Sequence, residues 1–126
     1  MAALRIEPAD DTPLVIMDKE KEVFEISGKS MPEDVVGFYQ PVFDWIDAYK
    51  KDPLEKTVLV FKLIYFNTAS SKVFLDLLMK FESIIEKGFE VEVKWHSLNN
   101  DEDMQDAGEE YEEMTGLKFE YLTFER

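Results

Sequence analysis

Hydrophobic positions are densest near the middle of the chain, where they predict a strand followed by a helix. Residues 57–66 are almost all β-branched, aromatic or aliphatic, which is typical of a central strand buried on both faces. Small polar residues follow at 67–72 and predict a turn. Apolar residues then recur at helical spacing as far as Gly88, where a helix is expected to end. A turn held between two such elements is exposed and well positioned, so function is expected there.

Alternating hydrophobic and polar positions near the amino terminus predict a β-hairpin. Strands are expected at residues 4–7, 14–17 and 22–26. The polar residues at 18–21 read as a tight turn, which makes the second and third strands antiparallel.

A helix is predicted after this hairpin, beyond a loop at residues 27–34. Ser30 is its expected N-cap, and Pro32 with Glu33 suits a first helical turn. Pro41 falls inside the helical pattern, so a kink or a break is expected there. The inner side of this helix is predicted to carry the apolar residues Val35, Val36, Tyr39, Val42, Phe43, Ile46 and Tyr49.

Two further strands and one more helix complete the pattern. Residues 89–96 alternate as a half-buried strand, and residues 118–124 predict a closing strand. Between them, residues 99–114 are strongly acidic but carry a thin apolar seam at spacings of three, four and three: Met104, Ala107, Tyr111 and Met114. The predicted order of hairpin, α, β, α, β, α, β indicates an α/β fold with a mixed sheet packed against helices, in one domain over residues 1–126.

Composition excludes several classes of protein. The chain of 126 residues has a formal net charge of −14, and a field of that sign repels nucleic acid and anionic membrane surfaces. It has no cysteine, which excludes disulfides and thiolate metal sites and fits a cytoplasmic location. No apolar run is long enough for a membrane span, and no signal segment opens the chain.

Candidates for catalysis or metal binding are weak. His96 is the sole histidine and lies at the end of a predicted strand, so it cannot build a His-rich metal site. The acidic segment Asp101–Glu113 invites a calcium hypothesis, but Asp106 stands where an EF-hand loop needs glycine. A solvated acidic helix face is the simpler interpretation. No phosphate-binding loop or hydrolase motif occurs, so no catalytic residue, cofactor or bound metal is expected.

The polar turn is the remaining candidate site. It contains Asn67, Thr68, Ser70, Ser71 and Lys72. One interpretation is structural: Ser70 caps the following helix, and its neighbours are turn residues. The other is a phosphorylation site, where a phosphoryl group would carry about −1.5 to −2 charges close to a helix N-terminus and a lysine.

At these residues the sequence resembles the SiaC-type regulatory phosphoproteins. The most specific match is Leu63–Lys72, which contains Tyr-Phe-Asn-Thr-x-Ser-Ser-Lys. Three segments support it over nearly the full length: Gly28–Glu33, Phe38–Val42 and Val93–Trp95. His96 departs from the pattern, which has an aromatic residue there.

The resemblance implies a STAS-like fold and a regulatory function without catalysis. It implies phosphorylation of Thr68 by a dedicated anti-sigma-factor-like serine/threonine kinase and dephosphorylation by a PP2C-like phosphatase. Asn67, Ser70, Ser71 and Lys72 would form the switch loop around it. The unphosphorylated form would bind and activate a diguanylate cyclase, in cyclic-di-GMP signalling and biofilm formation. Two alternatives are an anti-sigma-factor antagonist and a metal-binding protein that uses the acidic segment.

Overall fold

The computed structural model describes residues 1–125, which form one mixed sheet and a layer of helices. The elements in chain order are β1 (Leu4–Ile6), β2 (Leu14–Asp18), β3 (Val23–Ser30), α1 (Val35–Tyr49), β4 (Lys56–Phe66), α2 (Thr68–Ile85), β5 (Glu90–Leu98), α3 (Glu102–Met114) and β6 (Lys118–Phe124).

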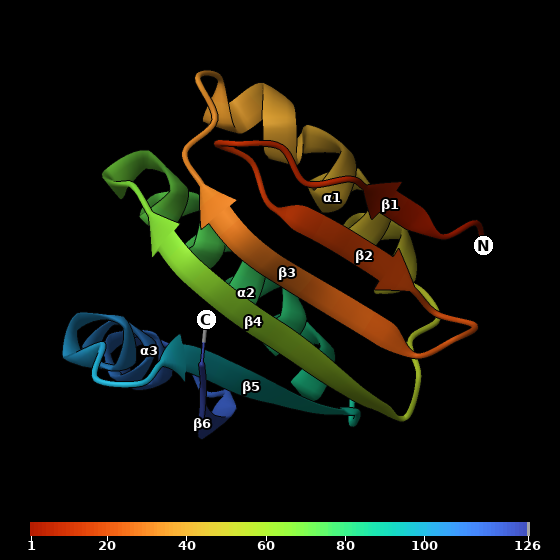
Figure 1. The fold of residues 1–126 in the computed structure, drawn as a ribbon. Coiled ribbons are helices and arrows are strands. Elements are labelled where there is room, and N and C mark those ends of the chain that lie inside the picture. The colour runs from red at the N-terminus through yellow and green to blue at the C-terminus, as the bar shows by residue number, and fades with distance from the viewer. Residues whose placement is uncertain (126) are drawn as a thin grey trace.

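The strands lie in the sheet in the order in which they occur in the chain. The pairs β1–β2 and β2–β3 are antiparallel, whereas β3, β4, β5 and β6 run parallel. Each parallel pair is joined through a helix, and since such crossovers share one hand, all three helices cover the same face of the sheet (Figure 1). The predicted α/β class, the N-terminal hairpin and the interior position of β4 are confirmed.

The prediction that β4 is buried on both faces is wrong. Leu59, Phe61 and Leu63 are buried under the helices, but Lys62 is exposed on the opposite face. That face carries no helix, and long side chains from different strands shield one another there. The Lys62 ammonium, for example, lies 4.7 Å from the centroid of the Phe124 ring.

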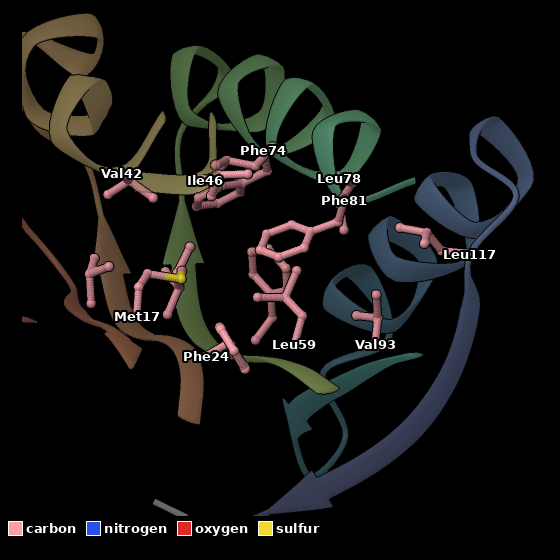
Figure 2. Close-up of a cluster of buried hydrophobic side chains, with 14 of the residues drawn as sticks. Met17, Phe24, Val42, Ile46, Leu59, Phe74, Leu78, Phe81, Val93 and Leu117 are labelled. Carbon is pink, nitrogen blue, oxygen red and sulfur yellow. The ribbon is translucent and has the colours of Figure 1, made fainter. Parts of the chain in front are cut away.

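The hydrophobic core lies between the helix layer and the sheet. Figure 2 shows Ile46 of α1 and Phe74 and Phe81 of α2 on the helix side, facing Met17 and Leu59 of the sheet. The largest fully buried side chains include Trp95, Tyr39, Tyr49, Phe24 and Phe61, so aromatic residues contribute much of the buried apolar area.

Three details of α1 differ from the sequence prediction. Val36 was placed on the inner side but is 65 % exposed, whereas Trp45, which was not predicted, is buried. Trp45 can be buried because its indole N–H donates to the Ala2 carbonyl at 2.9 Å, which satisfies its polar end. The expected break at Pro41 is absent, since α1 is continuous through that residue.

The predicted loop at residues 27–34 is wrong over its first half, because β3 continues through Ser30.

Strand β4 contains a β-bulge next to β3. The β3–β4 register advances from the pair Gly28–Leu63 to the pair Lys29–Tyr65, so Ile64 is an extra residue in β4. This bulge turns Phe66 toward Phe74 of α2, with ring centroids 5.3 Å apart. Backbone pairing with β4 therefore overrides the polar sequence at this point.

The cap of α1 is also corrected. Asp34, and not Ser30, is the N-cap, and its Oδ1 accepts a hydrogen bond from the Gly37 amide at 3.0 Å. Ser30 is fully buried at the end of β3.

Helix α3 packs on the sheet through a glycine. A Cβ atom at Gly108 would lie 2.6 Å from Cδ1 of Trp95, so a glycine lets the helix approach the indole ring. Met104 and Tyr111 of the predicted seam are buried, but Met114 is 56 % exposed. The seam is therefore shorter than the spacing predicted.

Candidate functional site

The polar turn lies at the edge of the sheet where the parallel strands end. The carboxyl ends of β3, β4 and β5 point to this edge, and the chain enters α1, α2 and α3 from it (Figure 1). In open α/β sheets this edge is where ligands and partners commonly bind. The β4–α2 connection is the shortest of the three, since Asn67 alone separates β4 from α2.

Asn67 is the N-cap of α2, and Thr68 is its first residue. The Asn67 side-chain oxygen accepts a hydrogen bond from the Ser70 amide at 2.9 Å, and the Ser71 amide donates to the Asn67 carbonyl at 3.0 Å. The predicted cap at Ser70 is therefore wrong. Asparagine is as good an N-cap as serine, and Asn-x-x-Ser could have been recognised as a cap with its third helical residue.

Ser70 belongs to a buried chain of hydroxyl groups. Its hydroxyl donates to the Ser30 carbonyl at 2.9 Å and lies 2.8 Å from the Ser30 hydroxyl. The Ser30 hydroxyl is in turn 2.6 Å from that of Tyr39. Burial raises the pKa of Tyr39, so this phenol stays protonated and can donate. The chain joins the end of β3, α1 and the start of α2.

This burial changes the role of Ser70 in the predicted switch loop. Ser70 is 0 % exposed, so its side chain holds the turn in place and does not face a partner. Ser30 and Tyr39 were not predicted as parts of the site. Both lie in segments that the resemblance includes, but nothing in the sequence pairs Ser30 with Ser70, because their contact depends on the β3–β4 pairing.

The other residues of the turn are accessible. The side chains of Thr68 and Lys72 are exposed, and Ser71 is partly buried. The Ser71 hydroxyl donates to the Thr68 carbonyl at 2.6 Å, and the Tyr111 hydroxyl donates to the Ser71 carbonyl at 2.8 Å. Tyr111 thus ties α3 to the first turn of α2.

This geometry suits addition of a phosphoryl group at Thr68. The hydroxyl stands on a fixed helix N-terminus, where the first amides have no intrahelical acceptor and the helix dipole favours negative charge. Among the threonine and serine residues of the predicted switch loop, Thr68 alone is exposed, as far as residues 1–125 show.

His96 lies elsewhere, on the open face of the sheet. It pairs in register with Lys62 of β4 and Leu122 of β6. Burial and then the positive charge of Lys62 lower the pKa of His96 below its usual value, which keeps the ring neutral at neutral pH. The departure from the family pattern at this position does not touch the turn.

The acidic segment has structural roles at both ends of α3. Asp101 is the N-cap, and its carboxylate accepts the Met104 amide at 3.0 Å. Glu112 accepts the Phe119 amide at 3.1 Å and the Tyr121 hydroxyl at 2.7 Å. Within the described part of the chain, no group of three or more His, Asp or Glu side chains is placed to hold a metal ion.

None of the helices formed by residues 1–125 is both long enough and apolar enough to cross a bilayer.

Comparison with known proteins identifies the family. The sequence profile of the SiaC family, described as regulatory phosphoproteins, matches residues 6–124. An uncharacterised protein of Pseudomonas aeruginosa strain UCBPP-PA14 is 28 % identical over 119 residues, which cover 94 % of each chain.

Solved structures of SiaC from Pseudomonas aeruginosa have the same fold. Apo-SiaC superposes with a TM-score of 0.87 at 26 % identity, covering 97 % of this chain and 99 % of that one. SiaC bound to the diguanylate cyclase SiaD, which it activates, superposes with a TM-score of 0.89 at 26 % identity, covering 96 % and 99 %. The STAS-like mixed sheet and the family resemblance are thus confirmed, and this chain belongs to the SiaC family of regulatory phosphoproteins.

Proposed function

We propose that this chain is a non-enzymatic phospho-switch that activates a diguanylate cyclase when Thr68 is unphosphorylated. The observation that carries the proposal is the exposed Thr68 hydroxyl on the first residue of α2, fixed by the Asn67 cap and the buried Ser30–Ser70 contact. Membership of the SiaC family and the SiaC–SiaD complex of a structural neighbour support it.

Phosphorylation at this position is expected to leave the fold intact. A negative group close to a helix N-terminus is favourable by about 0.3–1 kcal/mol. The residues that hold the turn, Asn67 and Ser70, keep their hydrogen bonds because neither involves the Thr68 hydroxyl. The effect of the phosphate must then fall on a partner.

The partner loses affinity because the phosphate would be desolvated in the interface. Burying a charge without a counter-charge costs about 2–5 kcal/mol, or roughly thirty-fold or more in affinity. A dedicated anti-sigma-factor-like kinase would set this state, and a PP2C-like phosphatase would reverse it. The kinase and the cyclase both consume nucleoside triphosphates, which places the switch in the cytoplasm.

The test measures cyclase activity and calorimetric affinity with the purified chain, phosphorylated and not. Thr68→Ala should activate constitutively and accept no phosphate from the kinase, and Thr68→Asp should bind weakly. Ser71→Ala is the matched control, because it removes the neighbouring accessible hydroxyl and should still be phosphorylated.

Three results would reject the proposal in different ways. Equal affinity of the phosphorylated and unphosphorylated chains, with matched melting curves, would exclude the switch. A lower melting temperature on phosphorylation would mean that the fold and not the interface is regulated. Capture of an anti-sigma factor in place of a cyclase would assign the chain to sigma-factor control.

A further inference from the structure

Two shallow hollows lie along α3, next to the turn that carries Thr68: one between α2 and α3, and the other between the end of β4 and the start of α3. One has a volume of about 210 Å³ and is lined on one side by the first two turns of α2. The other has a volume of about 230 Å³ and is lined on one side by the end of β4. Phe66 and Ala107 line both hollows, so the two adjoin at these residues. We call the combined depression the α2–α3 trough.

The trough follows one face of α3 for its whole length. The residues that α3 contributes are Asp103, Met104, Ala107, Glu110, Tyr111 and Met114. Their spacing places them on a single stripe over about three helical turns, or roughly 17 Å. A depression that runs parallel to a helix at this spacing matches the side of a second helix, as in helix-in-groove recognition.

The trough is apolar along its floor and at both ends. Phe66, Leu75 and Ala107 form the floor and are partly buried. Tyr65 at one end is 52 % exposed, and Met114 at the other is 56 % exposed. Large apolar side chains exposed along a hollow are typical of an interaction site.

The two sides of the trough carry opposite charge. On the α3 side stand Asp103 and Glu110, and α3 has no basic residue in its last turn to oppose them. On the α2 side stands Lys72, whose side chain is exposed. The chain as a whole has a net charge of −14, which disfavours nucleic acid and a second copy of this chain as occupants.

We propose that the α2–α3 trough binds an amphipathic helix of a partner protein. Its apolar stripe lies on Phe66 and Ala107. Its flank toward α3 is basic, and its flank toward Lys72 is acidic or uncharged. This inference rests on the proposed function, because it describes the partner segment whose binding Thr68 controls. A phosphate at Thr68 stands on the α2 side, where it repels the acidic flank and neutralises the attraction of Lys72.

A designed peptide tests the trough without the natural partner. The probe is a fluorescent helical peptide of about 18 residues, or five turns, with a leucine stripe, lysines on one flank and glutamates on the other. A scrambled peptide of the same composition is its control. The full chain should bind the amphipathic peptide at least about tenfold more tightly than the scrambled one.

A matched pair of variants locates the binding. Ala107→Arg fills the trough floor with a long side chain that can pair with Asp103 and Glu110 on the same helix, so the fold should persist. Ala48→Arg introduces the same residue on the exposed side of α1, where Asp44 is the equivalent acid. Ala107→Arg should weaken peptide binding at least about tenfold, and Ala48→Arg less than about twofold. Thermal melts verify that both variants are folded.

The possible outcomes separate this inference from the proposed function. If the cyclase is activated equally well by Ala107→Arg and Ala48→Arg, the trough is not the partner site, although the function stands. If no cyclase responds but the peptide results hold, the function fails and the trough remains a helix-binding site. Equal binding of the amphipathic and the scrambled peptide would contradict the inference that the trough binds a helix. So would a dimer in sedimentation that Ala107→Arg abolishes, since a second copy would then occupy it.

Discussion

At the scale of single residues, neighbouring serines of the turn have different roles. The Ser70 hydroxyl is buried and joins two elements through Ser30, whereas the Ser71 hydroxyl bonds to the carbonyl of Thr68 in the same helical turn. In the sequence they are adjacent and chemically identical. Their difference follows from the helical rotation of about 100° between consecutive residues, which turns Ser70 toward β3.

This difference predicts unequal effects on stability. Ser70→Ala leaves the buried Ser30 hydroxyl without its acceptor, so it should lower the free energy of unfolding by about 1–3 kcal/mol. Ser71→Ala changes a local bond near the surface and should alter it by less than about 0.5 kcal/mol. Urea denaturation of both variants measures the two values. Equal losses would mean that the buried hydroxyl chain does not hold the turn.

At the scale of elements, α2 is where the sequence pattern was most reliable. Of the apolar residues that recur at helical spacing after the polar turn, Phe74, Leu77, Leu78 and Phe81 are buried and Ile85 is partly buried, because a long amphipathic helix on one sheet face leaves a single phase for its apolar stripe. The pattern of α1 was less reliable at its start, where Val36 belongs to the first turn and lies beyond the edge of the core.

A pair of substitutions in consecutive residues tests the phase of α2. Leu78→Ala removes a side chain that is 0 % exposed and should cost about 2–5 kcal/mol of stability. Met79→Ala truncates a side chain that is 51 % exposed and should stay within about 0.5 kcal/mol. Guanidinium titrations of the two proteins provide the comparison. A small effect at Leu78 with a large one at Met79 would mean that the helix is rotated.

The sequence of β4 alone could not show that one face of the sheet carries no helix. Apolar residues at Val58, Val60 and Ile64 made β4 look buried on both sides. The hydrophobic periodicity of a strand shows how apolar each of its faces is. It does not show which face the helices cover, because that depends on the order of the strands in the sheet. Strand order is a property of the whole sheet. The Asn67 cap could have been predicted from the sequence. The Ser30–Ser70 contact could not, because it depends on the β3–β4 pairing.

At the scale of the whole molecule, excess negative charge opposes compaction. The net charge is −14, and the ion pairs described for residues 1–125, such as Lys80–Asp47 and Lys56–Glu92, lie at the surface, with side chains that are 28–52 % exposed. Exposed pairs contribute little, about 0–1 kcal/mol each, so self-repulsion is expected to dominate the electrostatic part of stability.

Salt should therefore stabilise the protein. Raising sodium chloride from about 0.01 M to about 1 M shortens the Debye length from roughly 30 Å to 3 Å and screens the repulsion. The melting temperature in calorimetry should rise over this range. Sodium sulfate at matched ionic strength separates screening from salting-out. A fall in melting temperature would mean that the surface ion pairs outweigh the net charge.

The placement of the two tryptophans gives the protein its own optical reporters. Trp95 is 1 % exposed, with its ring centroid 5.6 Å from that of Tyr111, and its indole N–H donates to the Met104 carbonyl at 2.8 Å. Trp45 stacks on Tyr49 within α1, at a centroid separation of 5.1 Å. Indole emission depends on its immediate surroundings. Any movement of α3 should therefore change the fluorescence of Trp95, while that of Trp45 serves as an internal reference in the same spectrum.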